Sequence, residues 1–532
     1  MDAENTILEK DDNGPEPDEQ EYINGLNLVL ILGALTLVFF LVMLDNTILA
    51  TAIPYITDEF NSLLDIGWYG SAYQLACAAL LPTTGKVYAR LNSKWFFLGC
   101  LVLFEVGSAI CGAAQSSKMF IVGRAVAGMG GSGLLNGALI IANSCVPPHK
   151  QPVLLGILMS LGQLGIAAGP LLGGAFTQYV TWRWCFYMNL PLGAVVLGLA
   201  FIRVPDHLSK PSFRDAFQNA VEEFDLLGVA LFAPAAIMFF LALEYSGSQY
   251  SWGSPHMVGL FVGAGVTFLL WLGWNWRAGD KGMAPFSILT QRIVWTSTIC
   301  ATFLSGTIFV TGYYLPIYFQ AILARTPFTS GVDVLANILA QMALGVIGGA
   351  GIQVLGYYTP FMVSGAMLNS LGCGLLGLLA VHTPTARWVG YQIIFGAGRG
   401  LASAVPIIAI QSSLPKDQIP EAMSILTFLQ NLSAAIMITV SQTIFTNGLV
   451  RLIPRYTPAV SASTVIDIGS TRFRSVVPAE SLGGVLQAYA ESLQRVWYFS
   501  GAIAVPSFVF ALFMGWQDIR KKPKEISQRA SS

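Results

Sequence analysis

The chain has 532 residues, of which 54% are hydrophobic and only 11% are charged, and its formal net charge is −1. Soluble domains typically carry about 25% charged residues, so a chain this apolar cannot cover itself with polar surface in water and must have lipid as its solvent. The nearly neutral charge gives no reason to expect a nucleic-acid or polyanion partner. The composition therefore predicts an all-α polytopic membrane protein.

The apolar runs predict fourteen membrane-spanning helices, since a helical crossing needs about 20 apolar residues. The hydrophilic, acidic stretch before the first run is unlike a signal peptide, so we expect an uncleaved first span. Lys and Arg gather in the short loops on the side of the two termini, which predicts that both termini are cytoplasmic. The expected spans are 27–54, 66–84, 95–114, 119–142, 153–176, 184–203, 226–244, 257–275, 294–320, 331–352, 358–381, 387–411, 422–447 and 496–516.

The spans divide the chain into predicted units. We expect a cytoplasmic tail over 1–26, a six-helix bundle over 27–203, an inserted two-helix hairpin over 226–275, and a second six-helix bundle over 276–516 that contains an extracellular loop at 448–495. A second cytoplasmic tail covers 517–532. The amphipathic connector at 204–225 either lies flat on the membrane surface or packs under the bundle, and both interpretations stay open.

Two carboxylates are embedded in predicted spans. Asp45 interrupts the first span in FFLVMLDNTILATAIP (Phe39 to Pro54), and Glu105 lies in the third. A charge at membrane depth costs about 2.5–3.5 kcal/mol on insertion scales, so it normally faces a partner or a water-filled cavity. Asp45 is a candidate proton site, or it forms a structural hydrogen bond. Glu105 is a proton site, a partner of Arg124 or a structural group, and becomes the better candidate if Asp45, about 27 Å along a helix from Asn27, lies too far out.

Two arginines lie in the predicted fourth and twelfth spans. Arg124 stands near the start of GRAVAGMGGSGLLNG, and Arg399 lies within GAGRGLA. An arginine keeps its proton, so it serves as a fixed charge that tunes a neighbouring acid. The alternative for Arg124 is that it snorkels to the headgroups from the helix end. By position Arg399 corresponds to Arg124 in the second half, and the alternative there is a structural ion pair.

A stripe of small residues follows in the fifth span. Gly165, Gly169 and Gly173 recur every four residues, so they share one helix face on which a neighbouring helix can approach closely. Pro170 removes a backbone hydrogen bond and bends the helix, and Gly174 completes the stretch. Helices that slide during transport and helices that simply pack tightly need the same residues, so the spacing does not decide between these roles.

Several motifs, in chain order, resemble those of fourteen-span drug/proton antiporters of the major facilitator superfamily. LDNTILATAIP resembles the first-span motif, GRAVAGMGGSGLLNG the fourth-span motif and GQLGIAAGPLLGG the fifth-span antiporter motif. TWRWCFYMNLPLG is similar to the fungal branch that includes mycotoxin and multidrug exporters, and YYLPIYFQAI and GAGRGLASAVPIIAIQ extend the resemblance into the second half. The resemblance implies two six-helix bundles around a central cavity with two helices inserted between them, and a proton-coupling role for Asp45 and Arg124.

The predicted function is export of a small hydrophobic compound, a secondary metabolite, mycotoxin or drug, in exchange for protons. A proton-coupled importer of an iron chelate or nutrient and a non-transporting receptor remain as alternatives. The chain lacks G-x-x-x-x-G-K-[ST], so ATP is not the expected power source. The four histidines and seven cysteines form no metal-ligand or nucleophile–base pattern, so we expect neither an enzyme nor a metal or cofactor.

The expected partners are the lipid bilayer, the transported compound and protons, and the expected state is a monomer in the plasma membrane rather than the vacuolar membrane. Polar and aromatic residues near span ends are candidates to line the cavity, although most such aromatics are interfacial anchors. These candidates are Gln74, Asn136, Gln163, Tyr313 and Tyr314.

Overall fold

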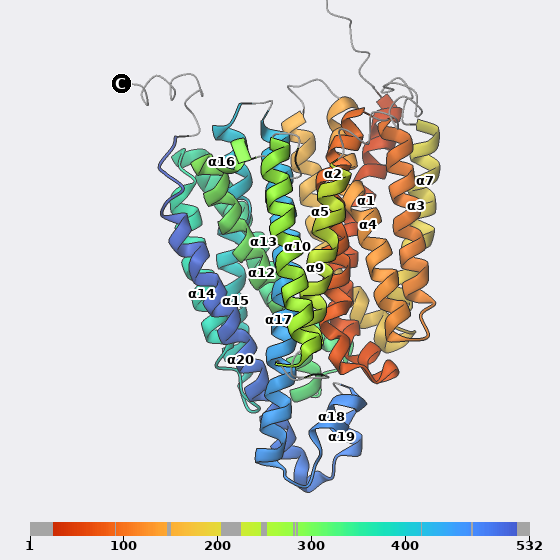
Figure 1. Ribbon diagram of the computed structural model, residues 1–532, viewed down its shortest axis with the longest axis vertical. Helices are drawn as coiled ribbons and strands as arrows, with labels where there is room; N and C mark the ends of the chain where they lie inside the picture. Colours follow the sequence, from red (N-terminus) through yellow and green to blue (C-terminus); the bar gives the residue numbers. More distant parts are fainter. Residues whose placement is uncertain are drawn as a thin grey trace, which may run out of the picture.

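The computed structural model describes residues 25–90, 92–145, 151–203, 225–245, 250, 253–279, 282, 286–415, 418–469 and 472–518. These residues form a bundle of long helices that run alternately up and down (Figure 1). The described chain begins and ends at the same end of the bundle, which we call the terminal end; the opposite end is the loop end. The predicted N-terminal tail up to residue 24, the connector at 204–224 and the C-terminal tail from residue 519 lie outside the described residues.

The first half of the chain supplies six long helices, with two short ones near the loop end. Asn92 begins one of them by accepting hydrogen bonds from the backbone N–H groups of Lys94 and Trp95, which have no partner within the helix. The helices are α1 (Gly25–Phe60), η1 (Leu63–Asp65), α2 (Ile66–Arg90), α3 (Ser93–Gly112), α4 (Ser117–Cys145), α5 (Gln151–Tyr179), α6 (Trp184–Tyr187) and α7 (Asn189–Arg203).

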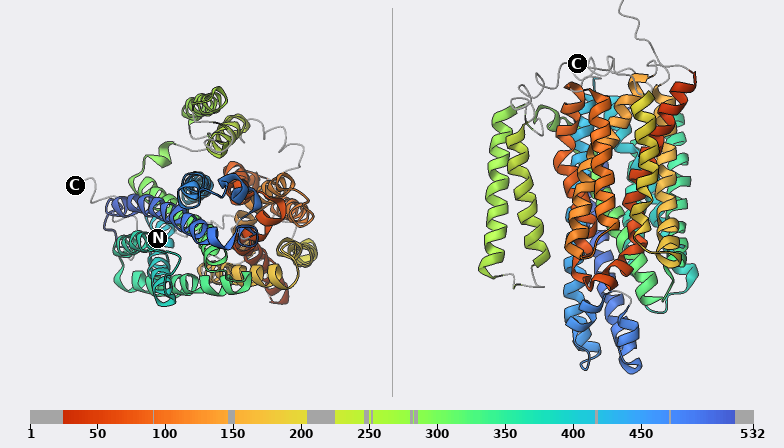
Figure 2. Two further views of the ribbon diagram at one scale, coloured as in Figure 1. Left: turned by 90° about the horizontal axis from the view of Figure 1, so that it is seen from below. Right: turned by 90° about the vertical axis from the view of Figure 1, so that its right-hand side faces the viewer.

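Two helices, α9 (Leu226–Tyr245) and α10 (Pro255–Ala278), stand outside the ring formed by the others (Figure 2). They attach through aromatic contacts. The ring of Phe232 on α9 lies 5.5 Å from that of Trp271 on α10 and 5.2 Å from that of Phe428 in the second half. The predicted inserted hairpin is therefore a side pair whose inner face packs on the main bundle.

The second half repeats the arrangement of long helices and adds two short helices at the loop end. Its elements are α11 (Phe286–Leu289), α12 (Arg292–Ile317), the π-helix η4 (Tyr318–Ile322), α13 (Pro327–Leu355), α14 (Thr359–Leu376), α15 (Thr385–Ser403), α16 (Val405–Ser413), α17 (Ile419–Tyr456), α18 (Ala462–Ile468), α19 (Phe473–Val476) and α20 (Ala479–Ala511).

Nine helices of the described part are long and apolar enough to cross a membrane. They are α1, α3, α4, α10, α12 with η4, α13, α14, α15 with α16, and α17. The segment predicted as an extracellular loop, 448–495, is largely helical: α17 continues to Tyr456 and α20 already begins at Ala479. The polar residues that suggested a loop lie on helices that extend beyond the apolar part of the bundle at the loop end (Figure 1).

The buried apolar residues show how the two halves meet. Near the loop end, one cluster runs through both halves and includes Ile53 of α1 and Phe319 of η4. Toward the terminal end, the described residues form a separate cluster in each half, around Leu35 in the first and Met362 in the second. A further cluster, which includes Ala78 of α2 and Ala435 of α17, joins the halves beside α9 and α10. The halves therefore share a core at the loop end and along α2 and α17, and each also has a core of its own.

Candidate functional site

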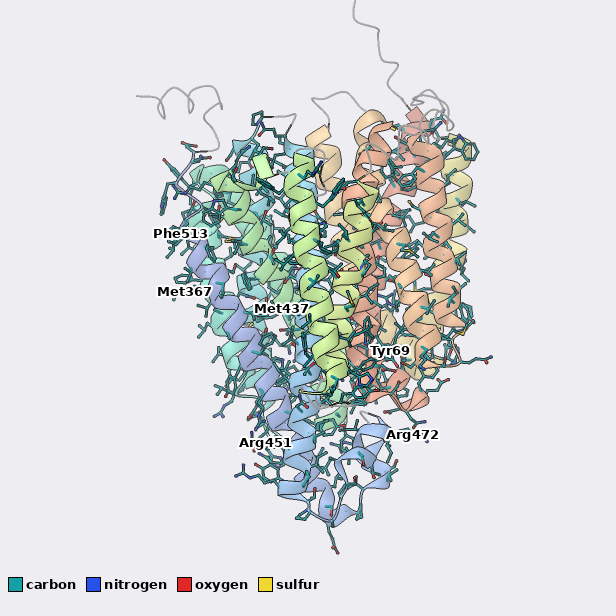
Figure 3. All side chains as sticks on the ribbon, in the orientation of Figure 1. Tyr69, Met367, Met437, Arg451, Arg472 and Phe513 are labelled. Carbon is teal, nitrogen blue, oxygen red and sulfur yellow. The ribbon has the colours of Figure 1, made fainter. Side chains whose placement is uncertain are left out.

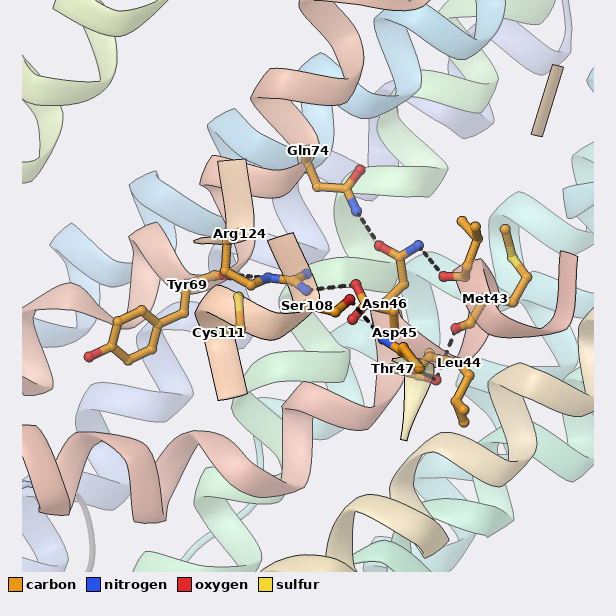
Figure 4. Close-up of polar contacts among 12 residues, drawn as sticks. Met43, Leu44, Asp45, Asn46, Thr47, Tyr69, Gln74, Ser108, Cys111 and Arg124 are labelled. Atoms are coloured by element: carbon orange, nitrogen blue, oxygen red, sulfur yellow. Dashed lines mark hydrogen bonds and ion pairs between the residues drawn. The ribbon is translucent and has the colours of Figure 1, made fainter. Parts of the chain in front are cut away.

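An ion pair lies inside the first half of the molecule. Nη1 of Arg124 on α4 is 2.6 Å from Oδ2 of Asp45 on α1, and both side chains are at most 1% exposed (Figure 4). The other carboxylate oxygen, Oδ1 of Asp45, is buried without a hydrogen-bond partner. The guanidinium also lies 4.5 Å from the centre of the Tyr73 ring, a favourable position for a cation. Arg124 is therefore buried against Asp45 and does not extend to the headgroups.

The two residues after Asp45 contact two further helices. The Asn46 side chain accepts a hydrogen bond of 2.9 Å from Gln74 on α2 (Figure 4). Thr47 Oγ1 is 3.4 Å from the Gly165 carbonyl on α5. Successive side chains on a helix point about 100° apart, so three neighbours reach three different helices. The side chains of Asp45, Asn46 and Thr47 thus connect α1 to α4, α2 and α5 at one height along the bundle.

The glycine stripe of α5 faces α1. A Cβ atom at Gly165 would lie 2.5 Å from the Phe40 carbonyl oxygen, one at Gly169 would lie 2.0 Å from Thr47 Oγ1, and one at Gly173 would lie 2.4 Å from the Ile48 carbonyl oxygen. These distances are too short for any side chain. The spacing thus places the stripe against one neighbouring helix.

The other side of α5 meets α13 of the second half near the loop end. A Cβ atom at Gly174 would lie 2.5 Å from the Pro327 carbonyl oxygen, and one at Gly331 would lie 2.2 Å from the Pro170 carbonyl oxygen. The predicted antiporter stretch is therefore a two-sided contact, with Gly165, Gly169 and Gly173 toward α1 and Pro170 and Gly174 toward the second half.

Glu105 on α3 stands apart from the ion pair. Both of its carboxylate oxygens are buried without a hydrogen-bond partner, and its Oε1 occupies the space beside Gly193 of α7, where a Cβ atom would lie 1.9 Å away. The interpretation of Glu105 as the partner of Arg124 is wrong, because Asp45 holds that position. The structural hydrogen bond weighed for Glu105 is also not formed among the described residues.

The second half contains the same helix packing as the first. A Cβ atom at Gly128 on α4 would lie 2.3 Å from the Tyr73 carbonyl oxygen on α2, and one at Gly396 on α15 would lie 2.1 Å from the Asn337 carbonyl oxygen on α13. One helix turn earlier, Arg124 Nε donates to the carbonyl of Tyr69 at 3.1 Å.

At the equivalent place in the second half, Gln392 Nε2 donates to the carbonyl of Asp333 at 3.0 Å. Arg124 and Gln392 each stand four residues before their contact glycine, and Tyr69 and Asp333 each stand four residues before their contact carbonyl. Gln392 therefore makes in the second half a hydrogen bond comparable to the one that Arg124 Nε makes in the first.

Arg399 has a different environment from Arg124. Its side chain is buried on α15, Nη1 is 3.4 Å from Oδ1 of Asn337, and Nε has no hydrogen-bond partner. No carboxylate of the described residues lies within ion-pair distance, so the structural ion pair considered for Arg399 is absent there. The helix equivalent to α1 by order, α12, contains no Asp or Glu. The buried charge pair thus belongs to one half of the molecule.

The predicted cavity residues are distributed over several helices. Gln74 contacts Asn46, and Asn136 Nδ2 donates to Thr84 Oγ1 at 3.3 Å. Tyr313 and Tyr314 on α12 are buried where the two halves meet, and the Tyr314 hydroxyl donates to Gln442 at 3.0 Å. The side chain of Gln163 lies outside the described part of the structure.

Sequence reasoning missed two glutamines that connect the halves. Gln320 of η4 donates to the carbonyl of Thr51 on α1 at 3.1 Å, and Gln442 of α17 donates to the carbonyl of Leu63 at 2.8 Å. Both are 3% exposed. The available signal was a polar side chain within a mainly apolar run, which is costly unless its amide is hydrogen-bonded.

The family to which the chain belongs follows from a comparison with protein-family models. The model described as the Major Facilitator Superfamily matches residues 35–438. The chain belongs to the major facilitator superfamily. It is accordingly a multi-pass membrane protein of a transporter family, and the predicted resemblance is confirmed.

Named relatives of this major facilitator protein are fungal. The chain is 49% identical to the MFS-type transporter pigP of Monascus ruber, over 94% of this chain and 88% of that protein. It is 44% identical to the efflux pump mlcE of Penicillium citrinum, over 95% of this chain and 93% of that protein.

A solved bacterial homologue of the human lysosomal transporter Spinster, in an inward-facing and unoccupied conformation, aligns with a TM-score of 0.63. The alignment covers 92% of this chain and 98% of that one at 14% identity, so it shows the shared fold alone.

Proposed function

We propose that this major facilitator protein exports a small hydrophobic organic compound, such as a secondary metabolite, mycotoxin or drug, in exchange for protons. The observation that carries the proposal is the buried pair of Asp45 and Arg124, with the second carboxylate oxygen of Asp45 unpartnered. The similarity to proteins named efflux pumps supports the direction.

In the proposed membrane arrangement the chain crosses fourteen times. The nine apolar helices are joined by α2, α5, α7, α9 and α20, which run alongside them. Both termini are cytoplasmic, the protein is a plasma-membrane monomer, and the loop end faces outside. The two six-helix bundles are 27–203 and 276–516, with 226–275 inserted between them. The shared core at the loop end then corresponds to a state closed toward the outside.

The proposed chemistry uses the free oxygen of Asp45. A proton from the outside adds to Oδ1, and the carboxylate becomes a neutral carboxyl group. Arg124 cannot lose its own proton, so its buried charge is left without a counter-charge. This imbalance favours rearrangement of the bundles, after which the restored pull of Arg124 promotes proton release to the cytoplasm. The same rearrangement of the bundles carries the proton inward in one direction and the compound outward in the other.

The test is transport of a hydrophobic fluorescent dye into or out of liposomes that contain the purified protein, with and without a pH gradient. We expect Asp45→Asn to abolish the gradient-driven component. Removing one partner of a buried pair typically costs about 3–5 kcal/mol, so the double variant Asp45→Asn with Arg124→Gln keeps the test valid if the single variant is unstable. The double variant copies the second half, where Gln392 makes the equivalent hydrogen bond without a charge.

Glu105→Gln identifies the carrier. If this variant loses the gradient-driven component while the double variant retains it, Glu105 and not Asp45 carries the proton. If every variant retains full gradient-driven transport, proton exchange at these residues is wrong. Dye movement toward the protein's cytoplasmic side under the same gradient would replace export by import.

A further inference from the structure

The segment Leu63–Gly70, which contains η1 and the start of α2, is hydrogen-bonded or contacted by residues of both halves of the molecule. We call it the α2 entry segment. On the side of the first half, Arg124 Nε donates to the carbonyl of Tyr69 at 3.1 Å (Figure 4). The same guanidinium holds Asp45 through Nη1 at 2.6 Å. One side chain thus connects the charge pair directly to the backbone of the segment.

On the side of the second half, Gln442 of α17 holds the other end of the segment. Its Nε2 donates to the carbonyls of Leu63 at 2.8 Å and Leu64 at 3.3 Å. Its Oε1 accepts a hydrogen bond of 3.0 Å from the Tyr314 hydroxyl on α12, which fixes the orientation of the amide. The side-chain amide of Gln442 therefore connects the two halves, and both its nitrogen and its oxygen are hydrogen-bonded.

A second contact from the second half lies on Gly70. A Cβ atom at Gly70 would be 2.5 Å from both Cζ and Oη of Tyr313, so the aromatic ring rests against the bare backbone of α2. Tyr313 is 3% exposed. Gly70 directly follows Tyr69, so the ring of Tyr313 and the guanidinium of Arg124 contact adjacent residues of the segment.

Other contacts between the halves near the loop end, such as that of Gln320 with Thr51, do not involve either member of the charge pair. The α2 entry segment is bonded to Arg124 itself. We propose that this segment transmits the protonation state of Asp45 to the second half, and that Gln442 and Tyr313 are the positioning residues that receive it. This inference rests on the proposed proton exchange.

The order of events follows from the bonds. When a proton adds to Asp45 Oδ1, the attraction that holds the guanidinium of Arg124 in place is lost. Movement of the guanidinium displaces the Tyr69 carbonyl, because Nε and Nη1 belong to one rigid planar group. The proton binds while the loop end is open to the outside, so the displaced segment lets the contacts of Gln442 and Tyr313 form and the loop end closes. The proton then leaves Asp45 toward the cytoplasm, which restores the charge pair seen in this structure, so no other reactant is needed.

The experiment compares Gln442→Leu with the matched variant Gln494→Leu in the liposome dye assay. Gln494 Nε2 also donates to a backbone carbonyl at 2.8 Å, that of Leu379, but within the second half alone. The measured quantity is the ratio of dye transport with a pH gradient to transport without one. We expect Gln442→Leu to lower this ratio by about 5-fold or more, the size of a typical coupling between sites, and Gln494→Leu to leave it unchanged.

A second pair of variants tests the same link without removing a hydrogen bond. Gly70→Ala pushes the ring of Tyr313 away, and Gly112→Ala makes the same change against Tyr187, where a Cβ atom would lie 2.5 Å from the ring but within the first half. Only Gly70→Ala should lower the gradient ratio. This pair decides the matter if Gln442→Leu does not fold.

The outcomes separate the two proposals. Suppose that the unmodified protein shows clear gradient-driven transport, but that Gln442→Leu has the same gradient ratio as Gln494→Leu and Gly70→Ala the same as Gly112→Ala. This result overturns the inference and leaves the proposed function intact. An unmodified protein that does not respond to the gradient overturns both.

Discussion

At the scale of residues, the structure explains why a charged group is tolerated inside an apolar helix. Asp45 is accompanied by Asn46 and Thr47, and each of the three side chains meets a different helix. A buried charge is stable only if it is paired and hydrogen-bonded, and Arg124 supplies both functions for one of the two carboxylate oxygens. The free oxygen is what distinguishes this pair from a fully satisfied structural ion pair.

Asp65 provides a prediction on pH-dependent stability. It lies between α1 and α2, outside the spans, and accepts a hydrogen bond from Ser117. Burial raises the pKa of its carboxyl group, while Ser117 and the charge of Lys118 oppose the increase. The folded protein therefore binds this proton more tightly than the unfolded chain, and the resulting stability is lost as pH rises through the folded-state pKa.

We expect Asp65→Asn to remove this contribution, so that the melting temperature of the variant in detergent falls less than that of the unmodified protein as pH rises over this window. Parallel curves for the two proteins would show that Asp65 does not titrate differently on folding. Ser117→Ala is the control, because it removes the hydrogen bond and keeps the carboxyl group.

At the scale of elements, α1 and α5 pack closely against each other. The glycine stripe brings the two helix backbones together at the level of the charge pair, with Thr47 contacting Gly165 beside Asp45. Small residues allow this approach because no Cβ atom separates the helices. The packing that the spacing predicts is present, and whether the helices also slide there remains part of the proposed cycle.

The stripe predicts unequal effects of the same substitution. Gly169→Ala places a methyl group where Thr47 Oγ1 lies 2.0 Å away, and overpacking of this kind typically costs about 1–3 kcal/mol. Gly198→Ala on α7 meets no atom within 4 Å and gains helix propensity of about 1 kcal/mol. Unfolding in detergent should show Gly169→Ala destabilised and Gly198→Ala equal to or above the unmodified protein. A stable Gly169→Ala protein would mean that α1 moves away from α5 at little cost.

At the scale of the whole molecule, the segment between α17 and α20 closes the loop end. Arg474 donates to the carbonyls of Ala321 at 2.8 Å and Ile322 at 2.6 Å, at the end of η4. Arg472 donates to the carbonyl of Asp58, near the end of α1, at 3.2 Å (Figure 3). Cations at helix C-termini are favourable because the last carbonyls lack partners within the helix. One short segment thus holds the ends of the first long helix of each half.

This arrangement predicts that Arg474→Ala loosens the loop end. Hydrogen bonds from a charged group contribute about 1.5–3 kcal/mol each, so amide hydrogen exchange over α18 and α19 and at the end of η4 should accelerate strongly. Arg451→Ala on the exposed face of α17 is the control and should leave exchange unchanged (Figure 3). Unchanged exchange in Arg474→Ala would show that the apolar core alone holds this end closed.

Much of the architecture could be predicted because it depends on local properties of the chain. Apolar runs locate helices such as α3 and α13 within a few residues, since the length of a run is visible without knowledge of its neighbours. Helix content was not predicted over 448–495, where α17 and α20 continue with polar residues. Polar composition there reports exposure to water and not the absence of a helix.

The sequence by itself determined that this protein is a helical membrane transporter of the major facilitator superfamily, and it singled out Asp45, Arg124, Glu105 and Arg399 as embedded charges. Only the tertiary structure decided that Arg124 pairs with Asp45 and not Glu105, that Gln392 bonds a backbone carbonyl of α13, and that Gln442 joins the halves. Hydropathy and motifs are properties of one segment at a time. The choice of a partner depends on which helices lie side by side and at what rotation, and in one chain that information exists only after folding.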